Sequence, residues 1–228
     1  MLSGRCALVT GSVAGLGYAI AESLAKAGAH IVLNGLCDPS EGQAAAERLS
    51  SATGVEVQFD GADLRKVSEI ERMMTEAADR FGKVDIVVNN AVVRHFSPIE
   101  AFSTEHWETA LAVNVSAAFH CTRLAVPAMR AQGWGRIINI SSIYGSRGAE
   151  NRIDYVTTKT ALLGMTRAVA IELAQTGITC NAICPGTVPS PAILDRIAAI
   201  AAERGVPVET AEREYITARH PTGRFVSM

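Results

Sequence analysis

Short apolar segments alternate with segments of helical periodicity along most of this 228-residue chain. Strands that are apolar on both faces and are separated by helices specify a parallel sheet covered on both sides, with right-handed crossovers. We therefore predict a doubly wound α/β fold, a Rossmann-like three-layer α/β/α sandwich. Strands are expected at 6–10, 30–34, 55–59, 85–89, 136–141 and 178–184, and helices at 15–27, 40–51, 70–81, 104–131 and 153–175.

Composition restricts the class of partner. The chain is 48% hydrophobic and 19% charged, which excludes a disordered protein, and we expect residues 1–228 to form a single domain. Its net charge is −2 with scattered Lys and Arg, so neither nucleic acid nor an anionic membrane is an expected partner. The sequence has no apolar run near the length of a membrane span and no signal-peptide pattern. These features indicate a cytoplasmic protein that acts on a small molecule.

The five cysteines form no CxxC pair. Cys6, Cys180 and Cys184 lie in or beside apolar strand-like runs, so we expect buried, reduced thiols and neither a disulfide nor a metal site.

A glycine-rich loop follows the first expected strand and opens the first helix. It reads Thr-Gly-Ser-Val-Ala-Gly-Leu-Gly over residues 10–17, so Leu16 separates Gly15 from Gly17. Glycines let a backbone turn tightly and approach phosphates, and a helix N-terminus offers N–H groups and partial positive charge. Gly11, Gly15, Leu16 and Gly17 are therefore candidate ligands of a dinucleotide pyrophosphate.

Tyr155 and Lys159 stand four residues apart in a helical segment, so they share one face. A free phenol titrates near 10, and a nearby ammonium lowers that pKa towards the range of a useful base. Ser142 ends the fifth strand, at the edge of the sheet where ligands of such folds bind. The three residues form a candidate site for removing a proton from an alcohol.

These motifs together resemble the short-chain dehydrogenase/reductase family, over most of the chain. The matching elements, in order, are the TGxxxGxG loop, Asp63-Leu64, Asn89-Asn90-Ala91, Asn114, Ser142, Tyr155-x-x-x-Lys159 and Pro185-Gly186.

The resemblance implies a role for each matching position. Tyr155 would transfer the proton, Lys159 would also hold the ribose hydroxyls, Ser142 would bind the substrate oxygen and Asn114 would help retain a relay water. Further cofactor contacts are implied for residues beyond the glycine loop: Asp63 at the adenine, Asn90 at a ribose, Val188 at the nicotinamide, and Leu64, Pro185 and Gly186 beside them. A helix-capping role for Asp63 remains an alternative.

Several stretches are most similar to bacterial 3-hydroxybutyrate dehydrogenases of that family, including 31–35, 60–64, 135–140 and 181–186. In those enzymes Gln, His and Lys hold the substrate carboxylate; here Arg94, Tyr144 and Arg152 stand at these positions. Arginine can clamp a carboxylate through two N–H groups. The resemblance thus implies hydride transfer between a nicotinamide cofactor and a small hydroxy acid or keto acid such as 3-hydroxybutyrate. Solvated surface arginines are the alternative interpretation.

The expected cofactor is NAD. A 2′-phosphate requires Arg or Lys near the glycine loop or after the second strand, but residues 34–38 read Asn-Gly-Leu-Cys-Asp and the loop carries Ala14. An NADPH-dependent reductase of 3-oxoacyl or sugar substrates is the competing prediction.

Two features depart from the family pattern, one residue and the C-terminal elements. Val92 stands where the family has glycine, which raises a third possibility of a cofactor-binding protein with little turnover. Family members also continue into another helix and a final strand, so the flank of the sixth strand should be exposed. The resemblance further implies a tetramer or dimer and a mobile helical lid at 187–220. Within that lid Ile193, Leu194, Ile197 and Ile200 form an apolar stripe, which ordinary packing would also explain.

Overall fold

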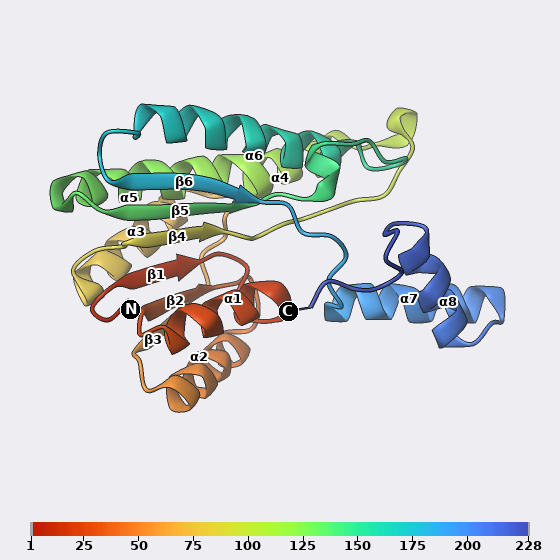
Figure 1. Cartoon of the computed structure of the whole chain (residues 1–228), viewed down its shortest axis with the longest axis horizontal. Helices are drawn as coiled ribbons and strands as arrows, with labels where there is room; N and C mark the ends of the chain where they lie inside the picture. The colour runs from red at the N-terminus through yellow and green to blue at the C-terminus, as the bar shows by residue number, and fades with distance from the viewer. Residues whose placement is uncertain (1, 228) are drawn as a thin grey trace. The chain divides into compact units, whose positions relative to one another are not determined.

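The computed structural model describes residues 2–227, which fall into two compact units divided after Cys184. The first unit contains a six-stranded sheet and the helices that cover it (Figure 1). Its elements in chain order are β1 (Cys6–Val9), α1 (Gly15–Lys26), β2 (His30–Asn34), α2 (Pro39–Thr53), β3 (Val57–Asp60), α3 (Val67–Phe81), β4 (Ile86–Asn89), η1 (Ile99–Ala101), α4 (Thr104–Leu111), η2 (Ala112–Ser116), α5 (Ala117–Gln132), β5 (Gly135–Ile140), η3 (Ile143–Gly145), α6 (Ile153–Glu172) and β6 (Ile178–Ile183).

The sheet is parallel throughout, with strand order β3-β2-β1-β4-β5-β6. The chain runs outward from β1 to β3, then returns to place β4 on the other side of β1. This reversal opens a crevice beyond the carboxyl ends of β1 and β4, where open α/β sheets bind their ligands. The segments that follow these two strands therefore define where a site should be sought.

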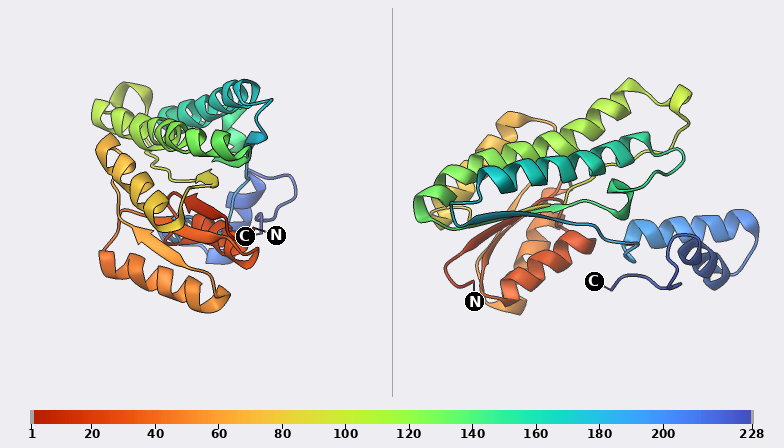
Figure 2. Two further views of the ribbon diagram at one scale, coloured as in Figure 1. Left: turned by 90° about the vertical axis from the view of Figure 1, so that its left-hand side faces the viewer. Right: turned by 45° about the horizontal axis from the view of Figure 1, so that its top comes forward.

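Alternation along the strands separates two hydrophobic cores. Cys6 and Leu8 of β1 pack into the cluster beneath α3 and α5, whereas Ala7 and Val9 pack beneath α1 and α2. The helices α3, α5 and α6 lie on one face of the sheet and α1 and α2 on the other (Figure 2). The predicted doubly wound fold is confirmed.

Two details differ from the sequence prediction. The expected helix 104–131 comprises two α-helices joined by the π-helical segment η2, and Pro127 lies inside α5 without ending it. Cys184 is exposed, as is Ile183 before it at the end of the edge strand β6, so the predicted burial of its thiol is wrong, whereas Cys6, Cys121 and Cys180 are buried as free thiols.

β6 lies at one edge of the sheet. Among the described residues it pairs with β5 alone, and its residues Thr179, Asn181 and Ile183 are exposed. The expected open flank of the sixth strand is therefore present in residues 2–227.

The second unit is a pair of helices, α7 (Pro191–Arg204) and α8 (Val208–Thr217). Its small core contains Ile197, Ala201, Ala211 and Tyr215, with Ile193 and Ile200 packed against them. Three members of the apolar stripe predicted on α7 thus pack inside this helical hairpin, whereas Leu194 is exposed.

Within the described part of the chain, no helix is long and apolar enough to cross a membrane. The same residues contain no cluster of three or more His, Cys, Asp or Glu side chains suited to a metal ion.

Candidate active site

The glycine loop after β1 has a backbone that side chains would not permit. Gly11 and Gly15 have φ values of 62° and 60°, in the left-handed region that favours glycine. A Cβ on Gly17 would overlap the carbonyl oxygen of Gly11 and lie 2.5 Å from Asn90 Nδ2. The sequence therefore needs glycine at all three positions to fold this turn.

α1 begins directly at this loop. Its N-cap is Ala14, and no described side chain caps the helix or places a carboxylate in its first turn. The first N–H groups of a helix need partners from outside it, and they favour anions. The bare helix N-terminus behind a close-fitting glycine turn therefore fits a pyrophosphate.

The end of β4 is tied to this loop. Thr10 Oγ1 accepts hydrogen bonds of 3.0 Å from the backbone N–H groups of Asn90 and Ala91. The Asn90 amide donates in turn to the carbonyl oxygens of Thr10 and Gly11, at 2.9 and 2.8 Å. Asn90, expected at a ribose, thus helps to shape the loop itself.

Val92 follows directly, and its backbone is not strained. Among residues 2–227, Asn151 is the sole non-glycine residue with a positive φ, so Val92 lies outside the left-handed region. Its side chain is 39% exposed. The conformational objection to valine at this position is therefore removed.

Asn34 at the end of β2 and Asp63 beyond β3 both form hydrogen bonds within the protein. The Asp63 carboxylate forms a bidentate pair with Arg65, 2.7 Å at its shortest, and these hydrogen bonds lower the pKa of Asp63. Leu64, beside it, is buried in the core. Asn34 is buried, and its amide donates to the carbonyl oxygens of Asp60 and Ala62 at 3.1 Å. Asn34 therefore braces strand ends, and the adenine contact of Asp63 stays a prediction.

Tyr155 and Lys159 lie on the first turns of α6, and the structure brings them together as the spacing predicts. Lys159 Nζ lies 5.7 Å from the centre of the Tyr155 ring. Lys159 is 2% exposed, and its Nζ donates a 2.6 Å hydrogen bond to the carbonyl oxygen of Ile140, the last residue of β5. An ammonium has three donors, so this contact leaves donor capacity for a ligand.

Burial perturbs the lysine strongly. Desolvation, helped by the positive charge of Arg94 and opposed by Cys184, lowers the pKa of Lys159 from 10.5 to about 8. At neutral pH the side chain is still mainly an ammonium, since its pKa remains above 7. A charged lysine therefore lies beside the Tyr155 ring.

Ser142 lies just past β5, at the strand end that hydrogen-bonds to α6 through Ser141. Its Oγ accepts a 3.2 Å hydrogen bond from the Tyr144 N–H, which leaves the hydroxyl proton for another acceptor. The neighbouring Ser141 Oγ donates to the carbonyl oxygen of Lys159 at 2.7 Å. The end of β5 is therefore fixed against the helix that carries the tyrosine.

Asn114 lies in the π-helical segment η2 and is buried. Its Oδ1 accepts from the Val93 N–H at 2.8 Å, and its Nδ2 donates to the Val93 carbonyl oxygen at 2.9 Å and to Thr158 Oγ1 at 3.0 Å. The side chain thus joins the segment after β4 to α6. Its part in a water relay stays a prediction.

Two of the three candidate substrate residues, Arg152 and Tyr144, lie beside the Tyr155 ring. The Arg152 guanidinium lies 3.9 Å from the ring centre of Phe96, 5.1 Å from that of Tyr155 and 5.9 Å from that of Tyr144. The Tyr144 and Tyr155 rings meet edge to face, 6.3 Å apart. The positive charge of Arg94 contributes to the lowered pKa of Lys159. Two cations, Arg152 and Lys159, therefore lie within 6 Å of the ring centre of the expected proton-transfer group.

The residues that sequence reasoning missed lie in the same surroundings. Phe96 stacks on Arg152, and the Arg147 guanidinium lies 5.2 Å from the Tyr144 ring centre. Their positions in the sequence could have indicated both, because Phe96 follows Arg94 by two residues and Arg147 follows Ser142 by five.

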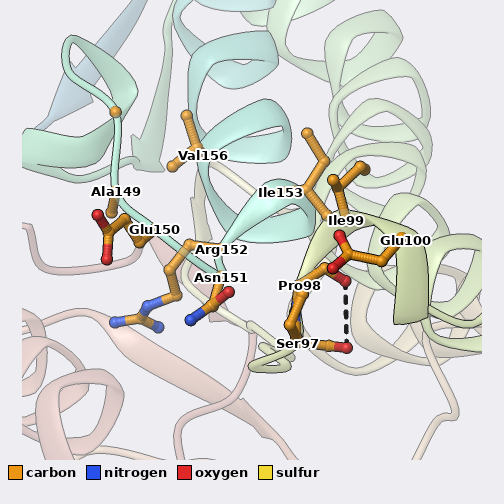
Figure 3. A pocket seen from close by; sticks show the side chains of 11 residues that line it. Ser97, Pro98, Ile99, Glu100, Ala149, Glu150, Asn151, Arg152, Ile153 and Val156 are labelled. Carbon is orange, nitrogen blue, oxygen red and sulfur yellow. Dashed lines mark hydrogen bonds between the residues drawn. The ribbon is translucent and has the colours of Figure 1, made fainter.

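A cavity of about 430 Å³ adjoins Arg152 (Figure 3). It is lined by residues 97–100, 148–153 and Val156, but by neither Ser142 nor Tyr155. Arg152 and Asn151 project from the same stretch of loop, with Glu150 beside them. The cavity is therefore a neighbour of the candidate site and not the space above the tyrosine.

Pro185, Gly186 and Val188 belong to the first segment of the second unit. Within that unit the Thr187 N–H donates to His220 Nε2 at 2.7 Å, and the Val226 N–H donates to the Thr187 carbonyl oxygen at 2.9 Å. A Cβ on Gly186 would lie 2.5 Å from the His220 ring. Their contacts with a cofactor stay predictions.

The fold and this arrangement of groups define a dinucleotide-dependent oxidoreductase. The family model for short chain dehydrogenases matches residues 5–198, and the chain belongs to that family. A nicotinamide dinucleotide is the cofactor of this class, and the glycine turn and bare α1 N-terminus fit it.

Individual relatives agree with this assignment. D-beta-hydroxybutyrate dehydrogenases of Cupriavidus necator and Rhizobium meliloti are 45% and 42% identical to this chain, over 100% and 98% of it and 87% of each relative. An L-sorbose reductase from Gluconobacter frateurii, solved with NADPH and L-sorbose, has a TM-score of 0.95 at 31% identity, over 99% of this chain and 86% of that one.

Proposed function

We propose that this chain is an NAD-dependent dehydrogenase that interconverts D-3-hydroxybutyrate and the corresponding keto acid. The observation that carries the proposal is the grouping of Tyr155 with the buried Lys159 and with Arg152, whose guanidinium suits a substrate carboxylate. Arg94, which acts electrostatically on the same lysine, is the second candidate for the carboxylate. The two hydroxybutyrate dehydrogenases named above support the choice of substrate.

The residues divide the chemistry between them. The bound nicotinamide supplies or accepts the hydride. Tyr155 takes the proton from the substrate hydroxyl and returns it in the reverse direction. Lys159, charged at neutral pH, stabilises the phenolate and has donors left for the cofactor ribose. Ser142 donates its hydroxyl proton to the substrate oxygen and so orients it.

Substrate recognition rests on charge. Arg94, Arg152 and Tyr144 would hold the carboxylate of the hydroxy acid, since guanidinium groups match its geometry and a phenol can donate a third hydrogen bond. Arg152 is half-buried beside aromatic rings, which strengthens this interaction by limiting competition from water. An uncharged alcohol of the same size should therefore be a poor substrate.

NAD is preferred over NADP in this proposal. Residues 11–17 and 34–38 contain neither Arg nor Lys, and Asp38 is the charged residue among them. A 2′-phosphate would find no cationic partner on these two segments. The proposal further includes a lid formed by residues 187–220 and assembly into a homo-oligomer.

The test is the formation of NADH from D-3-hydroxybutyrate, with L-3-hydroxybutyrate, NADP and uncharged alcohols as comparisons. Tyr155→Phe should lower kcat by about a hundredfold or more, because it removes the proton-transfer group. Preference for NADPH with 3-oxoacyl or sugar substrates would instead support the reductase alternative. If the wild type bound NAD without turnover, and Val92→Gly restored turnover, the chain would be a cofactor-binding protein with little activity of its own.

A further inference from the structure

The segment after β4, residues 92–97, is fastened at every second residue. Val93 is held on both backbone groups by the Asn114 side chain. The His95 N–H donates to Asp154 Oδ2 at 2.9 Å. The Ser97 N–H donates to the carbonyl oxygen of Asn151 at 3.3 Å. The segment is therefore a fixed arm beside the site.

Asp154 makes the central attachment. It is fully buried in the first turn of α6, immediately before Tyr155. Its Oδ2 also lies 3.0 Å from His95 Nδ1, and its Oδ1 accepts from the Tyr155 N–H at 2.6 Å. Burial of a carboxylate is costly unless hydrogen bonds compensate it. Its oxygens are satisfied by the arm on one side and by the backbone of the tyrosine on the other.

The His95 ring is held from a second direction. It stacks on His106 of α4, with ring centres 3.9 Å apart and planes 6° from parallel. Phe102 packs edge to face against both rings, with its ring centre 6.2 Å from each of theirs. With Nδ1–H donating to the carboxylate, the ring has one orientation, so the backbone of the arm at this point is fixed in place.

The residues on either side of His95 act on the candidate site. Arg94 acts electrostatically on Lys159. Phe96 lies 3.9 Å from the Arg152 guanidinium, itself 5.1 Å from the Tyr155 ring. A rotation of the arm about His95 would displace both neighbours relative to the tyrosine.

We propose that Asp154 and His95 are positioning residues of the reaction: the pair locks the substrate-recognising arm to the helix that carries Tyr155. The pair touches neither substrate nor cofactor in this proposal, and its role in substrate binding rests on the function proposed above. Its role in holding Arg94 near Lys159 does not depend on which substrate is used.

The test compares variants that break or preserve the contact. Asp154→Ala and His95→Leu remove it, whereas His95→Asn keeps an N–H donor at the place of Nδ1 and is the matched control. For D-3-hydroxybutyrate, the breaking variants should raise KM about tenfold with a smaller change in kcat, and His95→Asn should stay within about twofold of wild type. The Kd for NAD should not change in any of them.

A second readout needs no turnover. The side-chain amine of Lys159, one of four lysines, can be titrated by NMR in the cofactor-free protein and assigned through Lys159→Met. Release of the arm moves the Arg94 charge away, so the pKa of Lys159 should rise in Asp154→Ala and in His95→Leu. Arg94→Gln should produce the same rise, and His95→Asn should not.

The outcomes separate the two proposals. Absence of turnover in the wild type would refute the proposed function, and the lysine titration would still decide the positioning role. An unchanged KM and an unchanged Lys159 titration in a folded Asp154→Ala protein would overturn the inference. A rise in KM and in the pKa of Lys159 in His95→Asn as large as in His95→Leu would also overturn it, because the N–H donor would then be irrelevant.

Discussion

Replacement of Lys159 by methionine should stabilise the protein while it removes activity. The lysine is 2% exposed, and its pKa falls from 10.5 to about 8 chiefly through desolvation. That difference corresponds to about 3 kcal/mol of destabilisation at neutral pH, where the side chain is charged in both the folded and the unfolded chain. Lys159→Met also loses the hydrogen bond to the Ile140 carbonyl oxygen, which should cost the variant about 1 kcal/mol of stability. We therefore expect Lys159→Met to raise the free energy of unfolding by about 2 kcal/mol at pH 7.

The effect has a defined dependence on pH. Between about pH 8 and 10.5 the unfolded chain holds the proton of Lys159 more tightly than the folded chain does. The free energy of unfolding of the wild type therefore rises with pH across this window, and the variant lacks that contribution. The difference between the two proteins should shrink by about 2 kcal/mol between pH 7 and about 9.5.

Urea unfolding at several pH values measures both quantities. Lys26→Met is the matched control, because Lys26 is an exposed lysine whose side chain pairs with Glu22 on α1. It should change stability by less than about 0.5 kcal/mol at every pH. A Lys159→Met protein that is less stable than the wild type, with a pH-independent difference, would refute the burial argument.

Three further changes test other parts of the site. Gly17→Ala places a Cβ against the Gly11 carbonyl oxygen, so the Kd for NAD measured by calorimetry should be at least about tenfold weaker, and an unchanged Kd would show that the turn can adjust. Asn114→Ala removes three buried hydrogen bonds and should lower the free energy of unfolding by about 3 kcal/mol in urea. A loss below about 1 kcal/mol would mean that water replaces them. A thiol reagent at neutral pH should modify the exposed Cys184 far faster than the buried Cys121, whose pKa burial raises to about 12; equal rates, followed by mass spectrometry, would contradict the assigned burial.

The sequence predicted the parts of the site that depend on local geometry. The glycine turn is recognisable because one loop requires glycine at Gly11, Gly15 and Gly17. The spacing of Tyr155 and Lys159 on one helix likewise determines that they share a face. Strand positions followed from apolar runs, since a parallel sheet covered on both faces buries both sides of each strand.

Long-range contacts could not be predicted in the same way. Asp154 and His95 are 59 residues apart, and nothing in the sequence around either one indicates that they form a hydrogen bond with each other. Asn34 ends the second strand, and its amide donates to the carbonyl oxygens of Asp60 and Ala62, partners that its position in the sequence does not reveal. A polar residue reveals its partner only when the packing of the surrounding elements is known.

The π-helical turn η2 sets the rotational register of the two helices that it joins. Its five residues, Ala112–Ser116, form a turn wider than an α-helical one within an otherwise continuous rod, so the turn absorbs one extra residue. If the same residues took up α-helical spacing, that extra residue would rotate α4 by about 100° relative to α5. His106 would then leave the ring of His95, although every side chain around Tyr155 would be retained. In this part of the enzyme the hydrogen-bonding pattern of one turn is therefore as much a determinant of the site as the identity of its residues.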